Sequence, residues 1–225
     1  MANEFPSWHP EAHPDFDAAM TTASVEILDR LRDDPVFRSS ILEDPQVLHR
    51  HLYKHFVPPS HPEYAGTYRG TLGTSLEHRI MGGPSVIQQG KTFNFREPAG
   101  VPDATERLLA DVRTMIARAA TPWEQLWALT NLFARFGAIH PFLDGNGHVQ
   151  RALFSAAALE MGLQLSNRFA IHPRSYDFLL AFALETFTRS NTDDQRSQWA
   201  MAVAEYLAQW LAGPFDAPGS GLPPL

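Results

Sequence analysis

The sequence predicts an all-α fold that carries one small β-hairpin. Apolar residues recur at helical spacing through most of the first sixty residues and again after Pro102. Between these helical parts, residues 63–102 hold seven glycines and short runs of β-prone residues. The chain has 225 residues, 44% of them apolar and 19% charged, so one large domain with a sizeable core is expected.

Three helices are expected in residues 1–60, which we treat as an N-terminal helical extension. The apolar spacing predicts helices over about 17–32, 36–43 and 45–56. A proline separates the first two, since the residue before proline is pushed out of the helical region. A proline-rich break at 57–62 ends this part of the chain.

Three histidines lie on the third of these predicted helices. His51 and His55 are four residues apart, a spacing at which two imidazoles can chelate a metal, and His49 precedes them. No acidic third ligand is nearby, so a solvated polar face is the favoured interpretation.

A hairpin, about residues 84–96, is expected in the glycine-rich stretch, and we call it the flap. The runs 85–88 and 91–95 are β-prone and flank Gln89-Gly90, which is typical of a tight turn.

The chain after Pro102 is predicted to be helical as far as about residue 211. Thr121, Pro122 and Glu124 form a strong helix start, because they fit an N-cap, the first helical position and a capping box. The expected elements are a core over 61–190, a C-terminal helix within 191–212 and a flexible tail over 213–225, with helices at about 103–118, 121–139, 147–161 (closed by Gly162), 173–189 and 194–211.

Composition excludes several classes of function. The chain has no cysteine, which removes disulfides, thiolate zinc sites, iron–sulfur clusters and a cysteine nucleophile. Its formal net charge of −7 argues against a nucleic-acid partner. Its apolar runs are too short to cross a bilayer and no ordinary signal peptide is visible, so we expect a cytoplasmic protein without a membrane partner.

The segment from His140 to Arg151, His-Pro-Phe-Leu-Asp-Gly-Asn-Gly-His-Val-Gln-Arg, carries the chemistry. Gly145 and Gly147 at a helix start can form a nest of N–H groups that suits a phosphate. Arg151 lies one turn further, so its side chain leans back toward that nest.

The same loop offers a base and a metal ligand. His140 can accept a hydroxyl proton near neutral pH, and Asp144 is a hard oxygen ligand of the kind that shares Mg²⁺ with phosphates. Asn146 can donate to a phosphate oxygen or brace the loop. These groups together favour nucleotide-dependent transfer to a hydroxyl.

The loop resembles the Fic-domain signature His-x-Phe-x-(Asp/Glu)-Gly-Asn-Gly-Arg-x-x-Arg, over a region of about 60–190. The resemblance implies a Fic-type helical core with the flap over the site, and Mg²⁺-dependent transfer of AMP from ATP to a Ser, Thr or Tyr hydroxyl of a target protein. By position, the base is His140, the Mg²⁺ ligand is Asp144, the anchor of the loop is Phe142, and the phosphate contacts are Gly145, Asn146, Gly147, His148 and Arg151.

His148 departs from the signature, which has arginine there. It is kept as a phosphate contact against the alternative of a solvated helix residue, and it leaves the transferred group open: UMP, phosphate or a phosphocholine-like group instead of AMP. A non-catalytic binding module is the third alternative.

The resemblance also implies how the site meets its partners. The flap would align a target by strand addition, with Ile87 or Lys91 clamping a side chain, against the alternative of a solvated hairpin. Glu43 in Ser-Ser-Ile-Leu-Glu-Asp is the nearest approach to an internal inhibitory motif of such proteins, and an ordinary helix is the better interpretation. Control by a separate inhibitory protein is the alternative, and the sequence does not indicate an oligomeric state.

Overall fold

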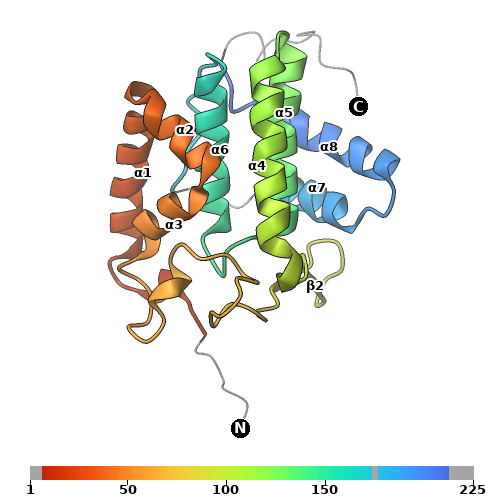
Figure 1. Cartoon of the computed structure of the whole chain (residues 1–225). Coiled ribbons are helices and arrows are strands. Elements are labelled where there is room, and N and C mark those ends of the chain that lie inside the picture. Colours follow the sequence, from red (N-terminus) through yellow and green to blue (C-terminus); the bar gives the residue numbers. More distant parts are fainter. Residues whose placement is uncertain (1–6, 174–176, 213–225) are drawn as a thin grey trace.

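The computed structural model describes residues 7–173 and 177–212 of the chain, so the predicted tail at 213–225 lies outside the described residues. Within them the fold is α-helical with one two-stranded antiparallel sheet, as the sequence predicts (Figure 1). The elements are α1 Phe16–Asp33, α2 Pro35–Glu43, α3 Pro45–Tyr53, β1 Gly82–Pro84, β2 Thr92–Asn94, α4 Val101–Arg118, α5 Pro122–Ile139, α6 Asn146–Glu160, α7 Phe178–Arg189 and α8 Asp193–Ala208.

Helices α5 and α6 form the centre of the molecule. Helix α5 packs against α4, α6, α7 and α8, and α6 packs against α1, α2 and α3 (Figure 1). The sequence of α5 is apolar on nearly every face, as a helix with neighbours all round requires. Its start at Thr121 has the predicted capping box, with the Thr121 and Glu124 side chains each bonded to the other's backbone N–H. The loop that follows α5 is therefore held between two buried helices.

The N-terminal helices contribute to the same core. The fully buried Leu31, Ile41 and Leu48 come from α1, α2 and α3, respectively, and belong to one apolar cluster with residues of α5 and α6. Helix α3 ends at Tyr53, so the predicted extension of this helix to residue 56 is wrong. The Phe56 N–H instead bonds back to the Tyr53 carbonyl in a turn.

The flap is present, but its first strand lies earlier than predicted. Gly82 pairs with Asn94 and Pro84 with Thr92. The expected strand at 85–88 is wrong, because the N–H groups of Val86 and Gln88 bond to side chains instead of to a facing strand. The Ser85 hydroxyl oxygen accepts the Gln88 N–H at 2.8 Å, and the Lys91 N–H closes the tip on the Gln88 carbonyl.

The tip of the flap is fastened to α7. The Glu185 carboxylate, 3% exposed, accepts hydrogen bonds from the Ser85 hydroxyl and from the Val86 N–H, each at 2.6 Å. Arg189 binds the same carboxylate at 2.7 Å, and its guanidinium lies 5.3 Å from the centre of the Phe93 ring. A buried carboxylate is stable only when it is paired in this way. Glu185 thus fixes the flap relative to the helical core.

Candidate functional site

The predicted base, His140, sits where α5 ends and the chain turns sharply. Its φ of 53° is left-handed, and among the described residues it is the only non-glycine with positive φ. A left-handed residue is a common way for a helix to end, although that residue is usually glycine. The turn carries the chain away from the α5 axis into the loop over 141–145.

The His140 ring is held by two neighbours. It stacks on the Phe95 ring of the flap with centroids 3.7 Å apart and planes 8° apart, and it is hydrogen-bonded to the Gly137 backbone. Burial, with the nearby charge of Arg69, lowers the pKa of His140 to about 3. The imidazole is therefore neutral at pH 7, and because one ring nitrogen donates to a carbonyl, the other carries no proton.

A buried arginine that the sequence analysis did not single out clamps the loop to the flap. Arg69 is 0% exposed, and its guanidinium donates to the carbonyls of Ile139 and His140 at 3.1 and 2.9 Å. It also donates to the carbonyls of Arg79 and Arg96, which lie on either side of the flap. The backbone N–H of Arg69 donates to the Pro141 carbonyl at 2.8 Å. One side chain thus positions both the end of α5 and the base of the flap.

His49 is buried, which corrects the predicted solvated face at this position, whereas His51 and His55 are exposed. The His49 ring stacks on the Phe142 ring, with the ring centroids 3.9 Å apart. Nδ1 accepts the Gly66 N–H at 2.8 Å and Nε2 lies 2.9 Å from the Asp144 carbonyl, so Nε2 carries the proton. Burial lowers the pKa of His49 to about 3, which matches this neutral, fully bonded state.

Asn146 braces the loop from inside. Its side-chain oxygen accepts the Phe142 N–H and its amide donates to the Phe142 carbonyl, both at 2.8 Å. Phe142 is fully buried, as an anchor of the loop would be. Of the two roles considered for Asn146, the structure displays the brace.

The start of α6 has the form expected of an anion site. Gly145 is its N-cap with φ 73°, and no side chain caps the helix, so its first N–H groups remain available. Arg151 leans back as predicted: a Cβ on Gly147 would lie 3.1 Å from Arg151 Nη1, and Arg151 Nε bonds to the Ile171 carbonyl at 2.8 Å. A guanidinium therefore lies beside the helix N-terminus.

Asp144 lies at the same end of α6. One of its carboxylate oxygens accepts the Gly145 N–H, and the other has no hydrogen bond within the described residues. Burial raises the pKa of this carboxyl, and a nearby cation would reverse that effect. Mg²⁺ is commonly held by one or two carboxylates together with substrate phosphates, so this residue fits the ion.

His148 lies at the site but points at protein neighbours. The Tyr53 hydroxyl is hydrogen-bonded to Nδ1 at 2.6 Å, and Nε2 lies 3.1 Å from His172 Nδ1. Nε2 of His172 in turn lies 3.6 Å from an Asp17 carboxylate oxygen. Burial lowers the pKa of His148 to about 3. In this conformation both ring nitrogens have protein partners, so a phosphate contact by this ring would require one of these hydrogen bonds to break.

The two flap residues predicted to clamp a target reach solvent. Ile87 is 37% exposed, and Lys91 is exposed at the tip of the flap. The alternation of hydrogen bonds leaves the backbone groups of Thr92 and Asn94 on the outer edge of β2, because Lys91 and Phe95 bond to β1 and its flanks. An extended segment can pair with that edge.

Comparison with known families agrees with this geometry. The model of the Fic/DOC family matches residues 41–158, more than half of the chain, from within α2 to near the end of α6. The chain belongs to the Fic/DOC family. No curated protein and no solved structure matches it. Fic/DOC proteins are generally transferases. Over the part of this Fic protein that the structure describes, no helix has both the length and the apolar character needed to cross a membrane.

Acid should destabilise this Fic protein through its buried histidines. His49, His140 and His148 have pKa values of about 3 in the folded protein against about 6.5 in an unfolded chain. Between these values the unfolded state binds more protons, so stability is complete above about pH 6.5 and is lost as the pH falls toward 3. We expect the urea concentration at the unfolding midpoint to be lower at about pH 5 than at about pH 7.5.

The matched control for this pH dependence is His49→Gln, since an amide can make both bonds of His49 without titrating. We expect a shallower fall for this variant. An unchanged midpoint in the parent protein, or an equal slope in the variant, would contradict the assignment of neutral buried histidines.

Gly145 tests how tightly the anion site is built. A Cβ there would lie 2.3 Å from the Tyr53 ring, at a φ of 73°, whereas Gly162, beyond the other end of α6, has φ 75° and open space. Gly162→Ala should cost about 1 kcal/mol from backbone strain alone. Gly145→Ala should cost about 1–3 kcal/mol more, because the buried Tyr53 ring must move. Urea unfolding measures the loss of stability in each variant. Equal losses would show that the Tyr53 ring moves aside at no cost.

Proposed function

We propose that this Fic protein transfers AMP from ATP to a hydroxyl of a target protein and releases pyrophosphate. The observation that carries the proposal is the placement of a neutral imidazole, His140, at the end of α5, next to a helix N-terminus flanked by Asp144 and Arg151. A nucleotide whose phosphates lie on that N-terminus has its α-phosphate within the same loop as the base.

In this mechanism the free ring nitrogen of His140 takes the proton of the target hydroxyl. The hydroxyl oxygen forms a bond to the α-phosphorus, and the bond between that phosphorus and the bridging oxygen of pyrophosphate breaks. The α6 N–H groups and Arg151 stabilise the charge on the phosphate oxygens. Phe95 and Gly137 hold the imidazole in place, so little reorganisation is needed.

Asp144 would hold Mg²⁺ through its free carboxylate oxygen. The ion would neutralise phosphate charge when it is bound. The Asp144 backbone is fixed for this role by His49, which donates to its carbonyl.

His148 is the observation that favours a second candidate group. The family signature has arginine at this position, and here the imidazole is engaged with Tyr53 and His172. One cationic contact to the leaving group is thereby missing, which leaves transfer of phosphate, UMP or phosphocholine as the second candidate.

The test is incubation of this Fic protein with lysate and ATP labelled at the α- or the γ-phosphate, followed by mass spectrometry of the modified proteins. Protein-bound label from the α-phosphate only is the expected result. Label from the γ-phosphate would indicate phosphate transfer, and label from neither would contradict the use of ATP.

A further inference from the structure

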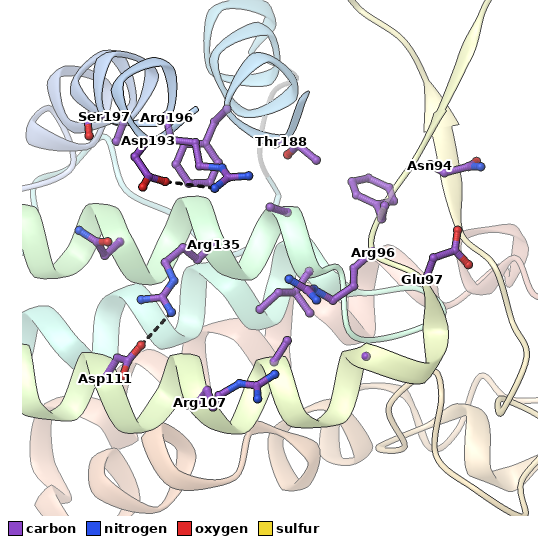
Figure 2. A pocket seen from close by; sticks show the side chains of 18 of the residues that line it. Asn94, Arg96, Glu97, Arg107, Asp111, Arg135, Thr188, Asp193, Arg196 and Ser197 are labelled. Atoms are coloured by element: carbon purple, nitrogen blue, oxygen red, sulfur yellow. Dashed lines mark hydrogen bonds and ion pairs between the residues drawn. The ribbon is translucent and has the colours of Figure 1, made fainter. Parts of the chain in front are cut away.

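A groove of about 950 Å³ lies beside the flap, away from the helix N-terminus that would hold the phosphates. It is bounded by the end of β2, by α4 and α5, and by α7 and α8 (Figure 2). Phe95, which stacks on His140, forms part of its wall, so the groove begins one ring away from the base. It is open to solvent.

Four arginines and three acidic residues line the groove, although the chain as a whole has a net charge of −7. Arg135 is paired with Asp111 at 2.8 Å, and Arg196 with Asp193 at 3.4 Å. Within the described residues, the guanidinium groups of Arg96 and Arg107 have no carboxylate partner, and both side chains reach into the same part of the groove (Figure 2).

Two unpaired guanidinium groups that share a groove repel each other, and an anion between them would remove that cost. Glu97 also lines the groove, as the third acidic residue beside Asp111 and Asp193. Asp111 and Asp193 are engaged in ion pairs. The remaining charged residues are Arg96, Arg107 and Glu97, so the groove keeps a net positive charge. The half-buried Trp127 and Phe187 supply apolar surface along it.

The groove is continuous with the free edge of the flap. Asn94, whose backbone N–H and C=O lie on the outer edge of β2, also lines the groove. An extended peptide that pairs with this edge can continue past Arg96 toward Arg107.

We propose that this groove binds an acidic segment of the target protein, next to the residue that receives the transferred group. This rests on the proposed function for the existence of a target, but the groove, its charge and its neighbours are independent of the group transferred. Target choice would then depend on Asp and Glu residues beside the acceptor hydroxyl, which steer association and fix register.

The test uses a fluorescein-labelled ten-residue peptide rich in Glu with one Phe, and its counterpart with Gln in place of Glu. Fluorescence anisotropy with the full chain should show binding of the Glu peptide that weakens with salt, and much weaker binding of the Gln peptide. The double variant Arg96→Gln/Arg107→Gln should weaken the Glu peptide by about threefold to tenfold, the range for two solvent-exposed charge pairs.

The matched control is Arg118→Gln, an exposed arginine on the same helix as Arg107 but outside the groove. We expect the affinity of this variant to equal that of the parent. Equal losses in control and groove variants, or no loss in either, would overturn the proposal. Tighter binding of an oligoribonucleotide with the same arginine dependence would assign the groove to nucleic acid instead.

The variant His140→Ala separates this proposal from the proposed function. It should bind the peptide as the parent does, because His140 does not line the groove. Arginine-dependent binding without any label transfer by the parent would leave the groove assignment standing and remove the reaction. Label transfer without arginine-dependent binding would leave the reaction standing and remove the groove assignment.

Discussion

His140→Ala should reduce label transfer from ATP by about 10²–10⁴-fold, the usual effect of removing a general base. The loss is expected in the chemical step, because the imidazole contacts Phe95 and Gly137 and is not among the residues placed on the nucleotide phosphates. Calorimetry should therefore show unchanged affinity for Mg-ATP. The measurement is the initial rate of protein labelling at saturating nucleotide.

His51→Ala is the matched control, since it removes an exposed histidine that the site does not use. Its labelling rate should equal that of the parent. A rate for His140→Ala within about threefold of the parent would contradict the assigned base, because a base that matters is worth far more.

The pH profile of labelling offers a further view of His140. With a pKa of about 3, the imidazole stays neutral from pH 5 to 9, so His140 itself should produce no acid limb near its usual value of 6.5. A profile whose acid limb has its midpoint near pH 6.5, and which loses that limb in His140→Ala, would show that the ring titrates as if it were exposed.

Arg69→Gln should lower the free energy of unfolding by about 3–5 kcal/mol, the range that accompanies loss of a buried hydrogen-bonded charge network. The carbonyls of Arg79, Arg96, Ile139 and His140 would lose a charged donor whose own side chain is fully buried. Urea unfolding at neutral pH measures the loss.

Arg69→Lys is the graded companion, because it keeps the charge and reaches fewer of these carbonyls. We expect an intermediate loss of stability. Labelling should fall in Arg69→Gln even at temperatures where it is folded, since His140 and the flap lose their common clamp. A fully stable and active Arg69→Gln would show that the clamp is dispensable.

Local chemistry explains what the sequence predicted correctly. The capping box at Thr121, the turn glycine at 145 and the return of Arg151 toward its helix start depend on residues within one or two turns of each other. The same holds for the helices, whose apolar spacing is local. The family signature falls in this class, since it is a single loop between two helices.

Residues that act across the fold escaped the sequence reasoning. His49 was grouped with two exposed histidines, yet Leu48, His49, Leu52 and Tyr53 are all buried and form one stripe, a spacing that could have assigned it to the core. Local spacing does not indicate the clamping role of Arg69, because its partners come from residues 79, 96, 139 and 140. The position of the flap strand also depends on a distant residue, since backbone pairing ends at the bond from the Ser85 N–H to the Lys91 carbonyl and Glu185 binds the Val86 N–H.

The contacts of His148 bear on how this loop can change in evolution. Because its ring is hydrogen-bonded to Tyr53 and His172, an arginine at position 148 would bring a permanent charge into a space shaped for a neutral imidazole. We therefore expect positions 53, 148 and 172 to be epistatic, so that an arginine at 148 lowers stability less when Tyr53 or His172 changes with it.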